Sequence, residues 1–115
     1  MLNQACEQIR LEFLGNEAVC ARVLTLFGLL SNKARFRIVC LLARGEFCVQ
    51  QITEVVGTGR LSNISQHLKM LTMAGVIVRR RDQTRILYSL KDKRIRKMIE
   101  FLRVQFMESE QQTAA

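Results

Sequence analysis

Six hydrogen-bonding side chains lie on one side of a helical pattern between residues 60 and 75. Apolar residues recur there at spacings of three and four, which places one apolar stripe on an α-helix and turns it inward. The opposite side carries side chains of short or moderate length that can reach base edges and phosphates in a DNA major groove. The stripe consists of Leu61, Ile64, Leu68 and Leu71, and the polar candidates are Ser62, Asn63, Ser65, Gln66, His67 and Lys69.

The amide side chains in this set are the stronger candidates for reading sequence. Asn and Gln can make paired hydrogen bonds with adenine, whereas serines more often position phosphates, so we expect specificity from Gln66 and Asn63. His67 has two interpretations, a contact with DNA or a packing role beneath the groove. The alternative for the whole set is an ordinary solvated helix face.

An arginine-rich hairpin is predicted directly after this helix. Ala74-Gly75 ends the helix, residues 76–78 begin an extended β-branched run, and Asp82 to Thr84 are turn-tolerant. Ile86, Tyr88 and Leu90 can then share one face of a second strand. Side chains alternate between the two faces of a strand, so we expect two or three of the arginines to meet phosphates or the minor groove. The basic candidates are Arg79, Arg80, Arg81 and Arg85, together with Arg60 before the helix.

Positive charge is concentrated around these two elements. The chain of 115 residues has a net charge of +8, and residues 60–97 hold eleven Lys and Arg against two Asp. That segment therefore carries +9, and the remainder of the chain carries −1. Clustering of this kind is the electrostatic footprint expected for binding a polyanion, while a merely solvated basic face is the alternative.

The rest of the pattern supplies a helical scaffold for the helix and the hairpin. The 17–30 segment is so rich in apolar residues that we expect much of its surface to be buried. Hydrophobic residues make up 49% of the chain, a high share for so basic a protein, so some of them are expected to face a partner subunit. The predicted elements are helices at 2–14, 17–30, 33–43, 50–56 and 91–106, an extended piece at 46–49 that pairs with the hairpin, and a glycine turn at 57–59.

The order of several short motifs resembles the arsenic-repressor (ArsR) family of winged helix-turn-helix regulators. The motifs are Ser65-Gln66-His67-Leu68-Lys69, then Leu71, then Ala74-Gly75-Val76-Ile77, then a basic turn and Tyr88-Ser89-Leu90, and the resemblance extends upstream to about Leu24. It implies a mainly α fold with a small β-hairpin, in the order α-α-α-β-α-α-β-β-α. It also implies a repressor that binds an inverted-repeat operator in double-stranded DNA as a homodimer, through its first and last helices.

Two departures from the family pattern affect the expected sites. The turn before the recognition helix is about one residue longer, so Ser62 is the candidate N-cap. The two metal-binding motifs of the family are interrupted, because Gln50 replaces a cysteine and Arg94 replaces a histidine. We therefore expect no metal and no cofactor. A metal- or metalloid-responsive repressor with a non-standard cysteine site stays an alternative, as does a DNA-binding module without a sensor.

Cys40 is the candidate for a thiol-based signal. Arg37 and Arg44 lie three residues before and four residues after it, on one helix face, so positive charge is expected to lower the pKa of the thiol. The alternative is a buried apolar cysteine. The surrounding residues resemble the first reactive cysteine of the redox- and sulfur-responsive branch of the family, whose second cysteine is absent here because Phe106-Met107 occupies that place. Cys20 is the expected partner.

The sequence offers little support for an enzyme or a membrane protein. It has no phosphate-binding loop, no nucleophile elbow and no pair of carboxylates in an apolar setting. No apolar run is long enough to span a bilayer, and the first residues lack the features of a signal peptide, so we expect a cytoplasmic protein. A single domain at 1–108 followed by a polar tail at 109–115 completes the prediction.

Overall fold

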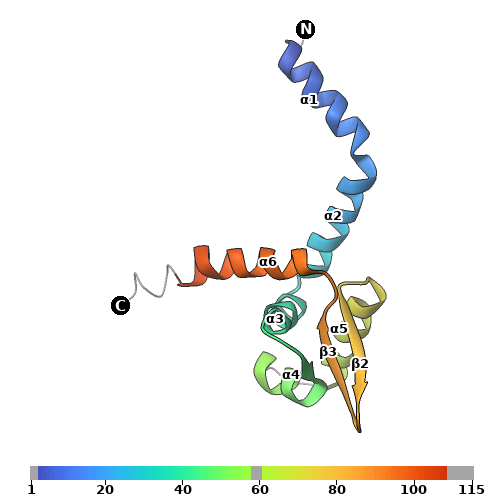
Figure 1. The fold of residues 1–115 in the computed structure, drawn as a ribbon, viewed down its shortest axis with the longest axis vertical. Coiled ribbons are helices and arrows are strands. Elements are labelled where there is room, and N and C mark those ends of the chain that lie inside the picture. The colour runs from blue at the N-terminus through green and yellow to red at the C-terminus, as the bar shows by residue number, and fades with distance from the viewer. Residues whose placement is uncertain (1–2, 58–60, 109–115) are drawn as a thin grey trace.

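The computed structural model describes residues 3–57 and 61–108, which form helices around a small antiparallel sheet (Figure 1). The order of elements agrees with the predicted winged helix-turn-helix arrangement, with a π-helical turn added at the end. The elements are α1 (Gln4–Gly15), α2 (Glu17–Leu30), α3 (Lys33–Leu42), β1 (Phe47–Cys48), α4 (Val49–Val56), α5 (Leu61–Met73), β2 (Ile77–Asp82), β3 (Arg85–Leu90), α6 (Lys93–Leu102) and the π-helix η1 (Arg103–Glu108).

The hydrophobic core lies where α3, α4, α5 and α6 pack against one face of the sheet. Each of these helices contributes apolar side chains at helical spacing, so the periodic stripes predicted from the sequence meet in one place. Burial of this surface is the main force that holds the helix-turn-helix and the hairpin together. The most completely buried side chains are Ile38, Val39, Leu42, Ile52, Leu68, Leu71, Ile77 and Ile99.

The sheet has the strand order β1-β3-β2, and all neighbouring strands are antiparallel. Phe47 lies opposite Tyr88, which confirms that the short piece before α4 pairs with the hairpin. Tyr88 and Leu90 are buried as the predicted alternation required, but Leu87 is buried as well. Because β3 is the central strand, Leu87 lies beside the buried Cys48 of β1 and does not face solvent.

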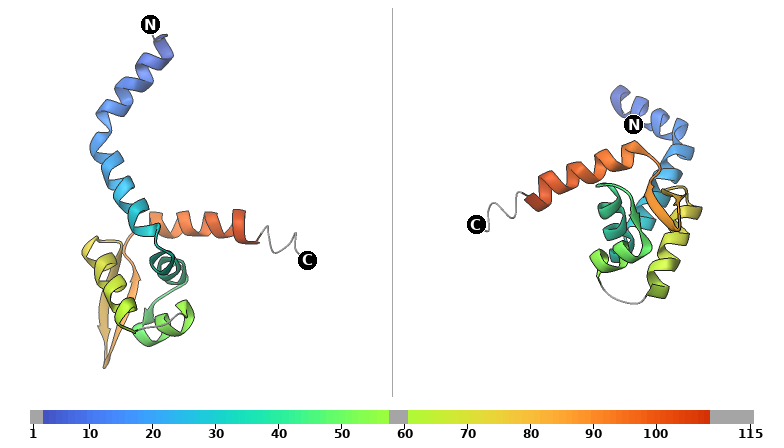
Figure 2. Two further views of the ribbon diagram at one scale, coloured as in Figure 1. Left: turned by 180° about the vertical axis from the view of Figure 1, so that it is seen from behind. Right: turned by 60° about the horizontal axis from the view of Figure 1, so that its bottom comes forward.

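Helices α1 and α2 form an arm that projects away from this body, with a bend of 71° between them (Figures 1 and 2). No residue of either helix is buried, so the expectation that much of the 17–30 surface is buried was wrong for a single chain. The apolar content predicted a covered face, but only the end of α2 reaches the body, where it packs on α3. Large apolar side chains therefore lie exposed along the arm, including Phe13 at 71% and Leu24 at 62%.

Within the described residues, no single helix is long and apolar enough to cross a membrane, and α1 and α2, as a bent pair, pass that test by length and composition only.

The last helix begins at Lys93, where Asp92 caps it by accepting a hydrogen bond from the Arg94 backbone N–H at 2.8 Å. Hydrogen bonds from the Arg94 side chain and backbone hold the pKa of the Asp92 carboxyl at about 2. The predicted 91–106 helix is thus an α-helix that changes to a π-helix at Arg103.

Candidate nucleic-acid interface

Helix α5 presents a polar face outward and an apolar stripe inward, as its sequence pattern predicted. Ile64, Leu68 and Leu71 are at most 3% exposed and lock the helix onto the core. Of the polar candidates that the structure describes, Asn63, Ser65, Gln66 and Lys69 are exposed. This arrangement leaves amide, hydroxyl and ammonium groups free to meet base edges and phosphates.

The start of α5 differs from the prediction. The helix already includes Leu61, so the backbone of Ser62 belongs to its first turn, and Ser62 is not the residue that precedes the helix. Arg60 lies outside the described residues. The end of the helix follows the prediction, because Gly75 takes the left-handed φ of 77° and the Val76 backbone N–H donates to the Leu71 carbonyl at 3.0 Å.

His67 turns toward the body and lies beside Arg35 of α3. The distance from Arg35 Nη1 to His67 Nδ1 is 3.5 Å, and Arg35 also donates to the Leu29 carbonyl at 2.7 Å. Burial and the neighbouring guanidinium lower the pKa of His67 below its ordinary value. A neutral imidazole can accept from Arg35, so this geometry supports the packing interpretation and places His67 between α5 and α3.

The hairpin arginines divide between the two faces of the sheet. Arg79 and Arg81 lie opposite Tyr88 and Ile86, so their side chains stand on the same face of the sheet as Tyr88, and both are exposed. Arg85 at the start of β3 is exposed too. No ion pair joins these three arginines to any residue in the described ranges, and Arg81 only donates to the Gln83 carbonyl at 3.2 Å. They are the wing cations available to phosphates.

Arg80 has a different environment, because it points to the other face and binds Glu46. Its Nε and Nη2 donate to the two carboxylate oxygens of Glu46 at 2.7 and 2.8 Å, in a bidentate ion pair. Glu46 directly precedes β1, and this pair therefore ties the wing to the start of the helix-turn-helix. Sequence reasoning missed Glu46, although its position beside a strand expected to pair with the hairpin was a usable signal.

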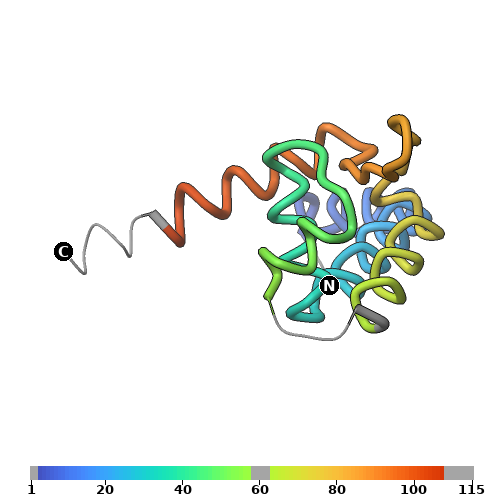
Figure 3. Tube along the Cα trace, turned by 90° about the horizontal axis from the view of Figure 1, so that it is seen from below, coloured from blue at the N-terminus to red at the C-terminus, as the bar shows by residue number. Residues whose placement is uncertain are grey.

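The helix face and the hairpin are brought together by the packing of α5 on β2 (Figures 2 and 3). The chain passes from one to the other through the turn at Gly75, and the buried Val76 and Ile77 fix the start of the strand. Lys69 and three wing arginines consequently belong to one continuous structural unit. Between residues 61 and 90 this unit contains a single acidic residue, Asp82. Such a basic surface with polar reading groups suits a DNA duplex better than a small ligand.

The structure contradicts the pKa predicted for Cys40. Burial raises the pKa of the Cys40 thiol, and the opposing effect of the Arg44 guanidinium is smaller. Arg44 does lie near the thiol, as the helical spacing suggested, but neighbouring elements remove the thiol from water. Cys40 and Cys20 also line different hollows, the first between α3, α4 and α6 and the second between α1 and α2.

The exposure of the four cysteines predicts the order in which they react. All four are free thiols, with Cys6 and Cys20 exposed, Cys40 half-buried and Cys48 buried. Alkylation proceeds through the accessible thiolate, so under limited iodoacetamide, at a protein concentration low enough to keep the chain monomeric, we expect Cys6 and Cys20 to be labelled first, Cys40 more slowly and Cys48 last. Mass spectrometry of timed, acid-quenched digests measures the order. Labelling of Cys40 ahead of Cys20 would mean that positive charge, and not burial, controls the reactivity of Cys40.

The part of the chain that the structure describes contains no group of three or more His, Cys, Asp or Glu side chains that could hold a metal ion. The single histidine, His67, is committed to the contact with Arg35 described above.

Comparison with known protein sequences gives a consistent set of relatives. Residues 32–78 match the family model described as bacterial regulatory protein, arsR family. The chain is 31% identical over 90 residues to the biofilm growth-associated repressor of Xylella fastidiosa, covering 78% of each protein. It is 35% identical over 86 residues to the HTH-type transcriptional regulator KmtR of Mycobacterium tuberculosis, covering 75% of this chain but less than two thirds, 65%, of that protein.

Solved structures share the fold. Reduced HlyU from Vibrio cholerae superposes with a TM-score of 0.72 at 27% identity, covering 78% of this chain and 94% of that one. A winged helix-turn-helix DNA-binding domain from Mycobacterium bovis, described as homodimeric, superposes with a TM-score of 0.70 at 27% identity, covering 84% and 89%. The winged helix-turn-helix described for the Mycobacterium bovis domain agrees with the order found here, in which α4 and α5 are followed by the β2-β3 hairpin.

Proposed function

This chain belongs to the arsR family of bacterial regulatory proteins, and we propose that it is a repressor that binds an inverted-repeat operator as a homodimer. The observation that carries the proposal is the exposed polar face of α5 beside wing arginines that have no acidic partner among the described residues. Asn63 and Gln66 would read bases, and Ser65 and Lys69 would contact phosphates. Arg79, Arg81 and Arg85 would hold the backbone of the duplex.

The arm supports the dimeric half of the proposal. Apolar side chains on α1 and α2 have no cover within one chain, and a second copy would bury them. A two-fold dimer presents two recognition helices, which matches a two-fold operator. The relative from Mycobacterium bovis is described as homodimeric, in agreement with this arrangement.

Phosphate contacts predict a specific salt dependence of DNA binding. Each neutralised phosphate adds about −0.9 to the slope of log affinity against log salt. Arg81→Gln should therefore flatten the slope, by roughly one unit per protomer, while weakening operator and scrambled DNA about equally. Fluorescence anisotropy with DNA from upstream of the protein's own gene, between roughly 50 and 200 mM salt, gives the slope.

Arg80→Gln is the matched comparison, because it removes the same charge from the neighbouring position. In the unmodified protein Glu46 binds the Arg80 guanidinium, so Arg80→Gln should change the salt slope less than Arg81→Gln does. Equal flattening by the two variants would mean that Arg80 leaves Glu46 for DNA. If neither variant changed the slope, the wing arginines would not contact DNA phosphates.

The proposed protein acts on DNA in the cytoplasm without catalysing a reaction, through one domain at residues 1–108. A thiol-based signal through Cys20 and Cys40 stays a prediction, and within a single chain Cys20 is exposed while Cys40 is half-buried. The two cysteines line separate hollows, so a disulfide between them would require rearrangement within one chain or pairing between two chains. A metal-responsive repressor and a DNA-binding module without a sensor are the remaining alternatives.

A further inference from the structure

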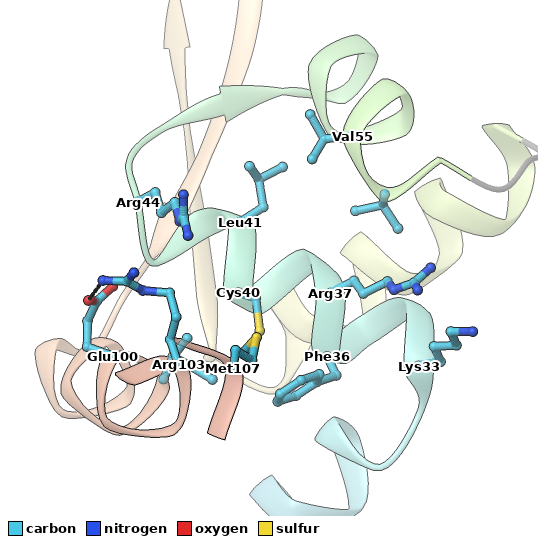
Figure 4. A pocket seen from close by; sticks show the side chains of 12 residues that line it. Lys33, Phe36, Arg37, Cys40, Leu41, Arg44, Val55, Glu100, Arg103 and Met107 are labelled. Carbon is cyan, nitrogen blue, oxygen red and sulfur yellow. Dashed lines mark hydrogen bonds and ion pairs between the residues drawn. The ribbon is translucent and has the colours of Figure 1, made fainter. Parts of the chain in front are cut away.

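A cavity of about 550 Å³ opens between α3, α4 and the junction of α6 with η1 (Figure 4). Its volume lies within the range of sites that hold small organic molecules. The cavity is separate from the exposed face of α5, because neither Gln66 nor the wing arginines contribute to its lining. It is therefore available to a ligand other than DNA.

The walls of the cavity are mainly apolar. Phe36 and Leu41 come from α3, Val55 from α4, and Met107 from η1, so three separate parts of the chain surround the space. Val55 is 63% exposed and Met107 is 40% exposed, and such side chains gain free energy when an apolar group covers them. The walls thus favour a ligand with a hydrocarbon or aromatic body.

The rim carries an excess of positive charge. Lys33, Arg37 and Arg44 line the cavity, and none of them forms an ion pair with a residue in the described ranges. Glu100 is the acidic residue in the lining, and it is engaged by Arg103 at 2.7 Å. Figure 4 shows that Arg44 and the Glu100–Arg103 pair stand at one end of the cavity and that Cys40 lies between them and Phe36.

Arg44 is the cation best placed to receive an anion. Figure 4 places it at the end of the cavity beside the Glu100–Arg103 pair, where Glu100 is bound by Arg103, and its charge opposes the rise in the pKa of Cys40. A carboxylate beside Arg44 would gain charge-assisted hydrogen bonds at the edge of an apolar space. Arg37 and Lys33, on the same helix as Cys40, extend this basic rim toward α4.

We propose that this cavity binds an amphipathic carboxylate, with the apolar body against Phe36, Leu41 and Val55 and the carboxylate at Arg44. The ligand would touch α3, α4 and η1 at once, and α4 is the first helix of the helix-turn-helix. Binding at this site is measured without DNA, so its failure is distinguishable from a failure of the proposed DNA binding.

Titration calorimetry with sodium decanoate, without DNA and below its micellar concentration, tests the site on the full chain. We expect saturable binding of one decanoate per chain, and roughly tenfold weaker binding to Arg44→Gln because one charge-assisted hydrogen bond is lost. Lys97→Gln is the matched control, since it removes one positive charge from an exposed position on α6 outside the cavity, and it should bind as wild type does.

A second readout locates the ligand. In a Cys6→Ser, Cys20→Ser background, bound decanoate should slow the alkylation of Cys40, whose side chain lines the cavity. Equal binding of decanol and decanoate would overturn the role of the cations. Absence of saturable binding, or binding that leaves both Arg44→Gln and Cys40 labelling unaffected, would overturn the site itself.

Discussion

Phe13→Asp should convert the protein into a monomer whose affinity for an inverted-repeat operator is lower by a factor of roughly a hundred or more. Joining two DNA-reading units commonly raises affinity by about 10² to 10⁴, and a monomer loses that gain. Phe13 is 71% exposed on α1, and no residue of α1 is buried, so the substitution should leave the fold of the chain intact. A carboxylate at this position would have to be desolvated in an apolar interface between subunits.

Sedimentation and operator anisotropy, measured on the same samples at micromolar protein, check this expectation. Gln8→Asp is the matched control, because it introduces the same charge on α1 at an exposed position on a different side of the helix from Phe13. We expect it to remain dimeric. A dimeric Phe13→Asp variant with normal operator binding would show that the arm is not the subunit interface.

Gln66→Ala should reduce the discrimination between operator and scrambled DNA by about 1 to 3 kcal/mol. Gln66 is exposed on the polar face of α5, so its removal costs contacts with bases and not the packing of the helix. Affinity for scrambled DNA should change little, since phosphate contacts dominate nonspecific binding.

The ratio of the two dissociation constants at one fixed salt concentration is the quantity to measure. Gln105→Ala is a suitable control, because Gln105 is an exposed glutamine in η1, remote in sequence from the recognition helix. Loss of affinity for both DNAs by the same factor would reassign Gln66 to phosphate contact. An unchanged ratio would mean that base recognition belongs to other residues of α5.

Elements with strong local patterns were predictable from the sequence. Residues 17–30 form a helix with the predicted bounds, because an apolar period and a break at each end define it locally. The last helix was harder. Its apolar period runs on into η1, and the period does not distinguish the α-helical hydrogen bonds of α6 from the π-helical ones that follow Arg103.

The partner of an apolar face could not be predicted in the same way. The pattern of α2 shows that one side of the helix avoids water, and it would read the same whether a single chain or a second copy covers that side. The fold leaves α2 exposed because the helix projects from the body on the arm. Apolar periodicity therefore identified a surface that avoids water, and the single chain leaves that surface uncovered.

Local period and composition were enough to predict the candidates for DNA contact on the polar face of α5 and among the wing arginines. Tertiary structure decided which of them are already engaged: Glu46 holds Arg80 across 34 positions, and Arg35 holds His67 across 32. It also decided the pKa of Cys40, because burial by neighbouring elements outweighs the charge of the nearby Arg44. Hydrogen bonding and desolvation depend on which groups lie close together in space. The spacing of residues along a helix shows only the neighbours on that helix, and not those that other elements bring alongside it.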